Sequence, residues 1–286
     1  MCGLAPPQTL GTADAPAPLS SFKSLELDTW QRGAAAYDRL FGAVTCEAVT
    51  PLLDALAVGP GQQLLDICCG TGQALAVALE RGAAVWGVDL APAMVERSRS
   101  RAPAATVVAG DAEALPFEDG RFDAAACWFG LNHLPDQERA LAEAWRVLRP
   151  GGLYGFTIWC PPGPSKFHEL VQEAIRSHGQ VDVPAPVDAP RLRFGEPELC
   201  LALLQAAGFE QAEVRELPLA FTLDSPHTVL ELAATSPRVS RLLALQSADD
   251  RQRIEEAIVA GALAFRRGDH LHLPIPALLT VGRKPA

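Results

Sequence analysis

The sequence has no hydrophobic stretch long enough to cross a membrane and no concentration of basic residues. No apolar run approaches the ~20 residues that a membrane-spanning helix needs, and the amino terminus lacks the basic and apolar segments of a signal peptide. The 24 Lys and Arg residues are outnumbered by 34 Asp and Glu residues and form no cluster. We therefore expect neither a nucleic acid nor a membrane as a partner, since both attract concentrated positive charge.

Cysteine pairs of the C-x-x-C type are also absent, although the chain has seven cysteines. Their odd number and scattered positions argue against a disulfide framework and a zinc ribbon, and favour a cytoplasmic protein. Cys68 and Cys69 are adjacent, but neighbouring residues of a strand point to opposite faces, so we interpret them as packing residues. His270 and His272, next to Asp269, lack a further ligand nearby, and we predict no metal site.

Short apolar segments alternate with amphipathic ones between residues 63 and 159. The expected strands are QLLDIC, AVWGVDL, ATVVAG, RFDAAACWF and GLYGFTIW. In the segment PDQERALAEAWRVLRPGG, the residues Leu141, Trp145 and Leu148 mark the apolar face of a helix that Pro150 ends. Near-continuous apolar strands between helices are typical of a parallel sheet buried on both faces, so we predict a doubly wound α/β fold.

This alternation breaks after residue 160 and later resumes. A helix is expected at FHELVQEAIRSHG, and two more are expected near 226–246 and 250–267. The apolar face of the last helix consists of Ile254, Ile258, Ala262 and Phe265. We expect 160–195 and 222–272 to lie over the carboxyl ends of the strands, where open α/β sheets bind ligands.

The stretch LLDICCGTGQ, residues 64–73, joins an expected strand to an expected helix through two glycines. Gly70 and Gly72 allow a tight turn and a close approach of the backbone to a ligand, as in a nucleotide-binding turn. A dinucleotide site would have a third glycine where this chain has Leu75. We therefore favour an adenine ligand without a pyrophosphate over a nicotinamide cofactor.

Three acidic residues accompany this turn. Asp66 precedes it, Asp89 ends the second expected strand, and Asp111 ends the third. A carboxylate at the end of the second strand is placed to accept hydrogen bonds from ribose hydroxyls. The alternative for Asp89 and Asp111 is a role as helix N-caps.

Five segments together resemble the class I, Rossmann-like S-adenosylmethionine-dependent methyltransferases, and in particular the branch with ubiquinone, menaquinone and natural-product enzymes. The segments are LLDICCGTGQ, VWGVDLAPAMV, GDAEALPFEDGRFDAAACW, LNHLPD and RVLRPGGLYGF. The resemblance implies a mostly parallel seven-stranded sheet with helical insertions that form a substrate cap. It also implies S-adenosyl-L-methionine as the cofactor. The quinone enzymes carry a basic residue where this chain has Asn132, so the quinone assignment stays open.

The resemblance also implies positions for the parts of the cofactor. Residues at the methionine end would be Asp66, Cys68, Gly70, Gly72, Trp128, Phe129 and Asn132. Asp89 would bind the ribose, Leu90 and Met94 would pack on adenine, and Asp111 and Ala112 would contact the adenine edge. For the aromatic residues, simple core packing is the alternative.

In relatives an amino-terminal helix often folds over the cofactor, so Trp30, Tyr37 and Phe41 are expected to form a lid, with cation–π attraction to the sulfonium. The alternative is that they pin a helix to the core. His133 is the candidate general base, Tyr37 is a second catalytic candidate, and His168 and His178 are weaker ones. The expected division is a flexible arm (1–22), a helical lid (23–60), the cofactor-binding core (61–160), an insertion (161–195) and the rest of the sheet with a helical substrate cap (196–286, cap 222–272).

We therefore expect methyl transfer, by in-line displacement in a closed pocket, to oxygen or carbon of a small hydrophobic or aromatic molecule of secondary metabolism. Alignment alone can supply much of the rate acceleration, so the reaction needs no conspicuous catalytic triad. The protein is expected to be a monomer or homodimer. The alternative is a cofactor-binding protein of this fold with a non-methylating or structural role.

Overall fold

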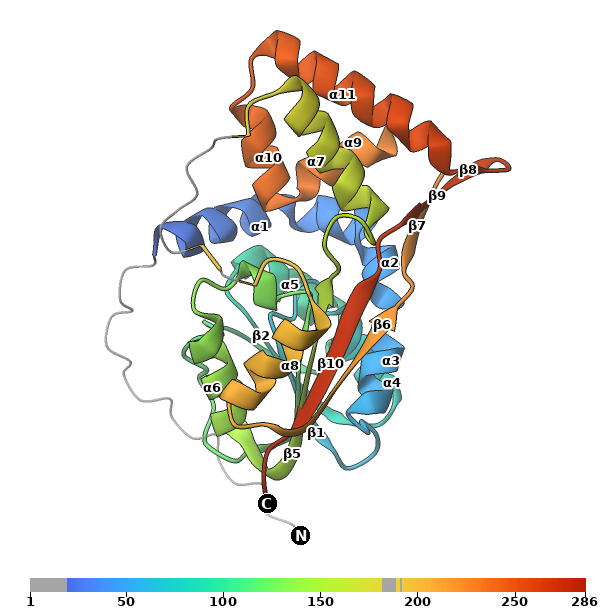
Figure 1. Ribbon diagram of the computed structural model, residues 1–286. Helices are drawn as coiled ribbons and strands as arrows, with labels where there is room; N and C mark the ends of the chain where they lie inside the picture. The colour runs from blue at the N-terminus through green and yellow to red at the C-terminus, as the bar shows by residue number, and fades with distance from the viewer. Residues whose placement is uncertain (1–19, 182–188, 191) are drawn as a thin grey trace.

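The computed structural model describes residues 20–181, 189–190 and 192–286 (Figure 1). Its main sheet has seven strands, and the order across the sheet is β3 (Thr106–Ala109), β2 (Ala84–Asp89), β1 (Gln63–Ile67), β4 (Phe122–Trp128), β5 (Leu148–Trp159), β10 (Ala277–Arg283) and β6 (Glu210–Leu217). The pairs from β3 to β5 are parallel, whereas β10 is antiparallel to both of its neighbours. The predicted doubly wound, mostly parallel seven-stranded sheet is confirmed.

Helices cover both faces of this sheet. One face is covered by α3 (Val49–Ala55), α4 (Gln73–Glu80) and α5 (Pro92–Arg101), and the other by α6 (Gln137–Val147) and α8 (Pro197–Ala206). In β4, Ala124 and Ala126 join one core cluster, while Ala125 and Cys127 join the other. Successive side chains of β4 thus point to alternate faces of the sheet, and they are apolar on both faces. A parallel strand with helices packed on both faces requires this pattern.

The end of α6 differs from the prediction in two ways. The helix ends at Val147, and β5 begins at Leu148 and continues through Pro150, which therefore does not act as the helix stop. Trp145 is 36% exposed, so its predicted place on the core face is wrong. Ala144 and Val147 take the buried positions instead, and the Trp145 ring lies under the Lys284 ammonium, with 3.7 Å between Nζ and the ring centroid.

The amino-terminal segment begins with α1 (Ser21–Leu40), followed by α2 (Gly42–Cys46). Ser20 caps α1 by accepting a hydrogen bond from the Lys23 N–H, so helix covers the last two residues of the expected flexible arm. Residues 1–19 of that arm lie outside the described residues. In Figure 1, α1 lies between α5 and the helices at the top of the view, and it contacts α5, α9 and α10.

Above α1 lies a second layer, which we call the cap. Its helices are α7 (Lys166–His178), α9 (Thr228–Thr235), α10 (Pro237–Ala244) and α11 (Ala248–Ala262). In α11, Ile254, Ile258 and Ala262 are buried as predicted, while Phe265 lies in the following turn, η2 (Leu263–Phe265). Of the expected insertion 161–195, residues 182–188 and 191 lie outside the described part of the chain.

The cap is not purely helical, and this corrects the prediction for 222–272. A three-stranded antiparallel sheet in the order β7 (Ala220–Leu223), β9 (His270–Pro274) and β8 (Arg266–Arg267) joins it to the core. Leu271 and Leu273 of β9 are buried, whereas His270 and His272 are exposed. His270 Nδ1 lies 2.8 Å from Asp224 Oδ1, and nowhere in the described ranges do three potential metal ligands gather. None of the helices described here is long and apolar enough to span a membrane.

Candidate active site

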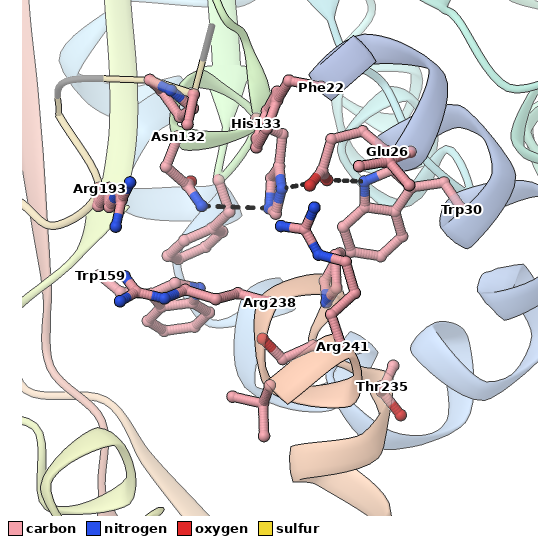
Figure 2. A pocket seen from close by; sticks show the side chains of 18 of the residues that line it. Phe22, Glu26, Trp30, Asn132, His133, Trp159, Arg193, Thr235, Arg238 and Arg241 are labelled. Carbon is pink, nitrogen blue, oxygen red and sulfur yellow. Dashed lines mark hydrogen bonds and ion pairs between the residues drawn. The ribbon is translucent and has the colours of Figure 1, made fainter. Parts of the chain in front are cut away.

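A cavity of about 930 Å³ lies where the carboxyl ends of β1, β2 and β4 meet α1 and the cap (Figure 2). Of the residues expected to bind the cofactor or to act in catalysis, most line it: Tyr37, Cys68, Gly70, Asp89, Leu90, Met94, Asp111, Ala112, Trp128, Asn132, His133 and His168. His178 does not. Asp66 and Gly72 do not line the cavity. Phe129 does, as do the other two aromatic residues of the expected lid, Trp30 and Phe41.

The glycine turn has the left-handed backbone that its sequence predicts. Gly70 has φ of 53° and Gly72 has φ of 81°. A Cβ on Gly70 would meet no atom within 4 Å, whereas one on Gly72 would lie 2.8 Å from the Cα atom of Ser98 in α5. Gly70 therefore leaves space free at the cavity, and Gly72 permits close packing of the turn on α5.

Asp89 ties the second strand to this turn. Its Oδ2 accepts a hydrogen bond from the Gly70 N–H at 2.9 Å, and its Oδ1 accepts one from the Ala91 N–H at 2.9 Å. Burial raises the pKa of this carboxyl against the opposing effect of these two hydrogen bonds. Both oxygens are thus held in place at the cavity wall, where they can accept further hydrogen bonds.

Leu75, in place of the third glycine, is fully buried against β2. A Cβ on Gly87 would lie 2.9 Å from Leu75 Cδ1. The missing side chain of Gly87, on β2, therefore leaves the space that the Leu75 side chain of α4 occupies. The Leu75 side chain thus fills the contact between α4 and β2, which a dinucleotide-binding turn keeps open with a glycine. This agrees with the interpretation that the turn does not hold a pyrophosphate.

Burial disfavours the charged forms of two groups near the turn. Asp66 is 1% exposed, its Oδ1 has no partner in the described structure, and burial raises its pKa well above the ordinary value. A hydrogen bond with Cys127, followed by burial, raises the pKa of Cys68 well above the usual thiol range. Cys69 packs on the opposite side of the sheet from Cys68, in agreement with the packing interpretation. Neither cysteine is suited to act as a thiolate.

At the expected adenine end, the Asp111 carboxylate already has partners. Its Oδ2 accepts a hydrogen bond from Lys23 Nζ at 2.7 Å, and its Oδ1 accepts one from the Glu113 N–H. Burial opposes the charge of Lys23, but its bonds to Asp111 and Glu113 outweigh burial and raise its pKa. Lys23 thus ties the start of α1 to the third strand, a link that sequence alone did not predict.

His133 is held by residues from α1. Its Nδ1 lies 2.8 Å from Glu26 Oε2, which also accepts a hydrogen bond from Trp30 Nε1 at 3.2 Å (Figure 2). The Trp30 ring meets the imidazole edge-on, with 5.0 Å between centroids. Glu26 is 5% exposed, so a carboxylate excluded from water orients the imidazole. Sequence analysis missed Glu26, because nothing local distinguishes it from a solvated helix residue.

Asn132 lines the cavity beside His133. Its Nδ2 is 3.2 Å from His133 Nε2, and its Oδ1 is buried without a partner in the described structure. The indole Nε1 of Trp128 is likewise buried and unpartnered. Because buried polar atoms are nearly always hydrogen-bonded in proteins, these two point to a polar ligand in the cavity.

The aromatic side chains of the expected lid pack in series. Trp30 meets Tyr37 edge-on at 5.4 Å, and Tyr37 stacks on Phe41 at 6.0 Å. Burial raises the pKa of Tyr37 to about 12. Tyr37 therefore stays protonated at neutral pH and is suited to donate a hydrogen bond rather than to act as a base.

The second half of α1 is joined to the glycine turn by charge. Asp38 Oδ1 accepts a hydrogen bond from Thr71 Oγ1 at 2.9 Å, and Asp38 Oδ2 accepts one from Arg101 Nη2 at 2.8 Å. Arg101 also donates to the Thr71 carbonyl. Hydrogen bonding to Arg101 lowers the pKa of Asp38. The turn and the helix above it are thus fixed relative to each other.

The cavity continues into the cap, where aromatic and cationic residues line it. Phe129, with φ of 56°, stacks on Trp159 at 3.9 Å between centroids, and Phe194 lies edge-on to His168. Burial lowers the pKa of His168 to about 3, so this imidazole is neutral. The cationic residues are Arg176, which pairs with Glu173, and Arg193, Arg238 and Arg241. No local signal in the sequence marks these arginines, because they come from separate segments and form no run.

These features fit the cofactor that the sequence resemblance implies. The turn leaves space at Gly70, Asp89 presents a fixed carboxylate, and apolar Leu90 and Met94 lie beside it. The unpartnered Asn132 Oδ1 and Trp128 Nε1 provide an acceptor and a donor farther along the same cavity.

Known proteins resemble this chain in sequence over the same region. A family model described as a methyltransferase domain matches residues 65–156. The demethylmenaquinone methyltransferase of Beutenbergia cavernae is 43% identical over 118 residues, which cover 41% of this chain and 49% of that protein. The ubiquinone/menaquinone biosynthesis C-methyltransferase of a Ruegeria species is 34% identical over 186 residues, 59% of this chain and 74% of that protein. The chain spans about half the length of the first curated relatives it matches.

Solved structures resemble it in fold. A phosphoethanolamine N-methyltransferase of Haemonchus contortus, solved with S-adenosyl-L-methionine, superimposes with a TM-score of 0.59. The sequences are 20% identical, and the match covers 95% of this chain and 62% of that one. At this identity the likeness concerns the fold alone.

Proposed function

The chain belongs to the class I S-adenosylmethionine-dependent methyltransferases, and on this basis we propose that it transfers a methyl group to oxygen or carbon of a small acceptor with an aromatic or apolar body. The observation that carries the proposal is the continuity of the cavity. It runs from Gly70 and Asp89 to the aromatic wall of Trp159 and Phe167 as one continuous space. Cofactor and acceptor can therefore meet in it.

We propose that the cofactor lies along the carboxyl ends of β1, β2 and β3. Asp89 would accept hydrogen bonds from the ribose hydroxyls, Leu90 and Met94 would contact adenine, and the backbone at Asp111 and Ala112 would bind its edge. At the methionine end we place Cys68, Gly70, Trp128 and Asn132, while Asp66 and Gly72 support the turn from outside the cavity. When bound, S-adenosylmethionine would supply a methyl group on a positively charged sulfur. The sulfur leaves readily as a neutral thioether when the methyl group is transferred.

The chain's own contribution is alignment, exclusion of water and removal of a proton. Alignment of the two reactants can contribute ~7–11 kcal/mol in favourable intramolecular cases. His133 is the proposed general base, with Glu26 fixing the orientation of its ring. Tyr37 would donate a hydrogen bond to the bound molecules, and α1 would act as the lid that closes over them.

Methyl transfer to a panel of aromatic acceptors tests this proposal. Purified protein is incubated with methyl-labelled S-adenosylmethionine and naphthols, hydroxynaphthoic acids and soluble hydroquinones, and labelled product is quantified. We expect labelled product from at least one acceptor, and a rate ~10²–10⁴-fold lower for His133→Ala, the range for loss of a general base. His178→Ala, on the exposed side of α7, is the control and should keep the wild-type rate.

Two results would contradict the proposal. Cofactor binding without transfer to any member of the panel would favour the alternative of a non-methylating protein with this fold. An unchanged rate in His133→Ala would remove His133 from the mechanism while leaving methyl transfer intact.

A further inference from the structure

The cap end of the cavity holds three arginines for which the described residues provide no acidic partner. Arg193 lies just before α8, and Arg238 and Arg241 lie on one face of α10, three positions apart. Figure 2 shows all three around the space that Asn132, His133 and Trp159 also line. Arg193 and Arg241 are half-buried, while Arg238 is more exposed.

The carboxylates that also line this part of the cavity are engaged elsewhere. Glu169 pairs with Lys166 at 2.6 Å, Glu173 pairs with Arg176, and Glu26 holds His133. The one ring contact of the arginine cluster is that of the Arg241 guanidinium, which lies 5.9 Å from the centroid of Phe22. Three like charges therefore face one space, and among the residues that the structure describes none of the three forms an ion pair with an acidic side chain.

The neighbouring groups show that these charges influence one another. Partial desolvation, followed by the positive charges of Arg193 and Arg241, lowers the pKa of Arg238. The nearby His168 is neutral and adds no charge. Like charges brought together in a partly dry cavity are unfavourable unless an anion joins them.

We propose that the cap arginines bind the anionic group of an aromatic organic acid, and that this acid is the methyl acceptor. Guanidinium groups present paired N–H donors that match the oxygens of a carboxylate, phosphate or sulfonate. The aromatic rings of Trp159, Phe167 and Phe194 line the same cavity as the arginines. An aromatic body packed there would place its anion at Arg238 and Arg241 and its nucleophile toward His133. This inference rests on the proposed function, whose acceptor it narrows from any apolar molecule to an anionic one.

A matched pair of fluorescent probes tests the charge requirement without any turnover. The anion 8-anilinonaphthalene-1-sulfonate is titrated into protein saturated with S-adenosylhomocysteine, and the uncharged analogue N-phenyl-1-naphthylamine is titrated in parallel. Arg238→Gln/Arg241→Gln is expected to raise the dissociation constant of the sulfonate at least about tenfold, equivalent to ~1.4 kcal/mol. The constant of the uncharged probe should change by less than about twofold, well under that energy.

The control removes the same charge elsewhere. Arg266→Gln/Arg267→Gln alters two exposed arginines of β8 that do not line the cavity, and both probes should bind it as they bind wild type. If the cap double variant leaves sulfonate affinity unchanged, or weakens both probes equally, the proposal is overturned. Displacement of the probe by sulfate alone, at constant ionic strength and equal concentration, would also overturn it, because the site would then suit a free inorganic anion.

Failure of this inference is distinguishable from failure of the proposed function. Calorimetry measures S-adenosylhomocysteine binding to the same variants, and wild-type affinity in the cap double variant shows that it is folded. If wild type does not bind S-adenosylhomocysteine, the proposed function fails. The probe titrations are then carried out on the protein without S-adenosylhomocysteine, and they still decide whether the arginines select an anion.

Discussion

Replacing Asp89 should weaken cofactor binding more than any other single change at the turn. Both of its oxygens are fixed by backbone N–H groups at 2.9 Å, so the carboxylate is already positioned when a ribose arrives. A hydrogen bond to a charged group contributes ~1.5–3 kcal/mol. Loss of two ribose contacts in Asp89→Ala therefore amounts to ~3–6 kcal/mol, or a dissociation constant ~10²–10⁴-fold higher.

Titration calorimetry with S-adenosylhomocysteine measures this effect directly. The measurement is paired with thermal unfolding, since Asp89→Ala also leaves the Gly70 and Ala91 N–H groups without their partner. Asp249→Ala, at an exposed position of α11, removes the same charge far from the turn and should bind with wild-type affinity. A folded Asp89→Ala protein that binds within about threefold of wild type, less than ~1 kcal/mol, would refute the assignment of Asp89 to the ribose.

Three further changes have defined outcomes. Asp38→Asn should lower the free energy of unfolding by ~1–3 kcal/mol at neutral pH. Because Arg101 lowers the pKa of Asp38, this difference between wild type and variant should be present above the ordinary Asp pKa and should vanish as pH falls through the lowered pKa. Denaturant melts at a series of acidic pH values measure it. Asp66→Asn should stabilise the protein at neutral pH. Because burial raises the pKa of Asp66, the folded state binds an extra proton, and the stability of wild type falls as pH rises above the ordinary Asp pKa. Melts of the variant should not show this fall. Gly70→Ala should cost ~1–2 kcal/mol of stability, since its φ of 53° strains any side chain, and calorimetry should show weaker S-adenosylhomocysteine binding because the new methyl group projects into the cavity. Unfolding free energies equal to wild type at every pH would contradict the first two predictions, and unchanged S-adenosylhomocysteine affinity in Gly70→Ala would contradict the third.

Strands β1 to β5 of the central sheet were predictable because each of them carries its own signal, whereas β6, with mostly exposed residues, carries none. Continuous apolar residues bounded by glycines and acids mark β1, β2 and β4, and Asp89 follows from its place at a strand end. The parallel direction of these five strands then follows from the rules of α/β folds, whereas the antiparallel direction of β10 does not. The cavity lining from these strand ends was accordingly found from sequence.

The contacts made by α1 were not predictable, because they join positions far apart in the chain. Lys23 and Asp111 are 88 positions apart, and Glu26 and His133 are 107 apart. A lysine or glutamate on an amphipathic helix is normally solvated, and only the packing of α1 over the strand ends buries these two. The small sheet of the cap was missed for a related reason. The alternation in β9 is short, and its partner β7 lies almost fifty residues earlier, so pairing rather than local pattern defines it.

A crystal structure of the complex with S-adenosylhomocysteine tests the central claim most directly, namely that this cavity holds the cofactor with its sulfur facing the acceptor space. We predict ribose hydroxyls within hydrogen-bond distance of Asp89, adenine beside Leu90 and Met94, and the sulfur directed toward His133 and Asn132. Ligand density outside this cavity, or a ribose that does not contact Asp89, would contradict the account.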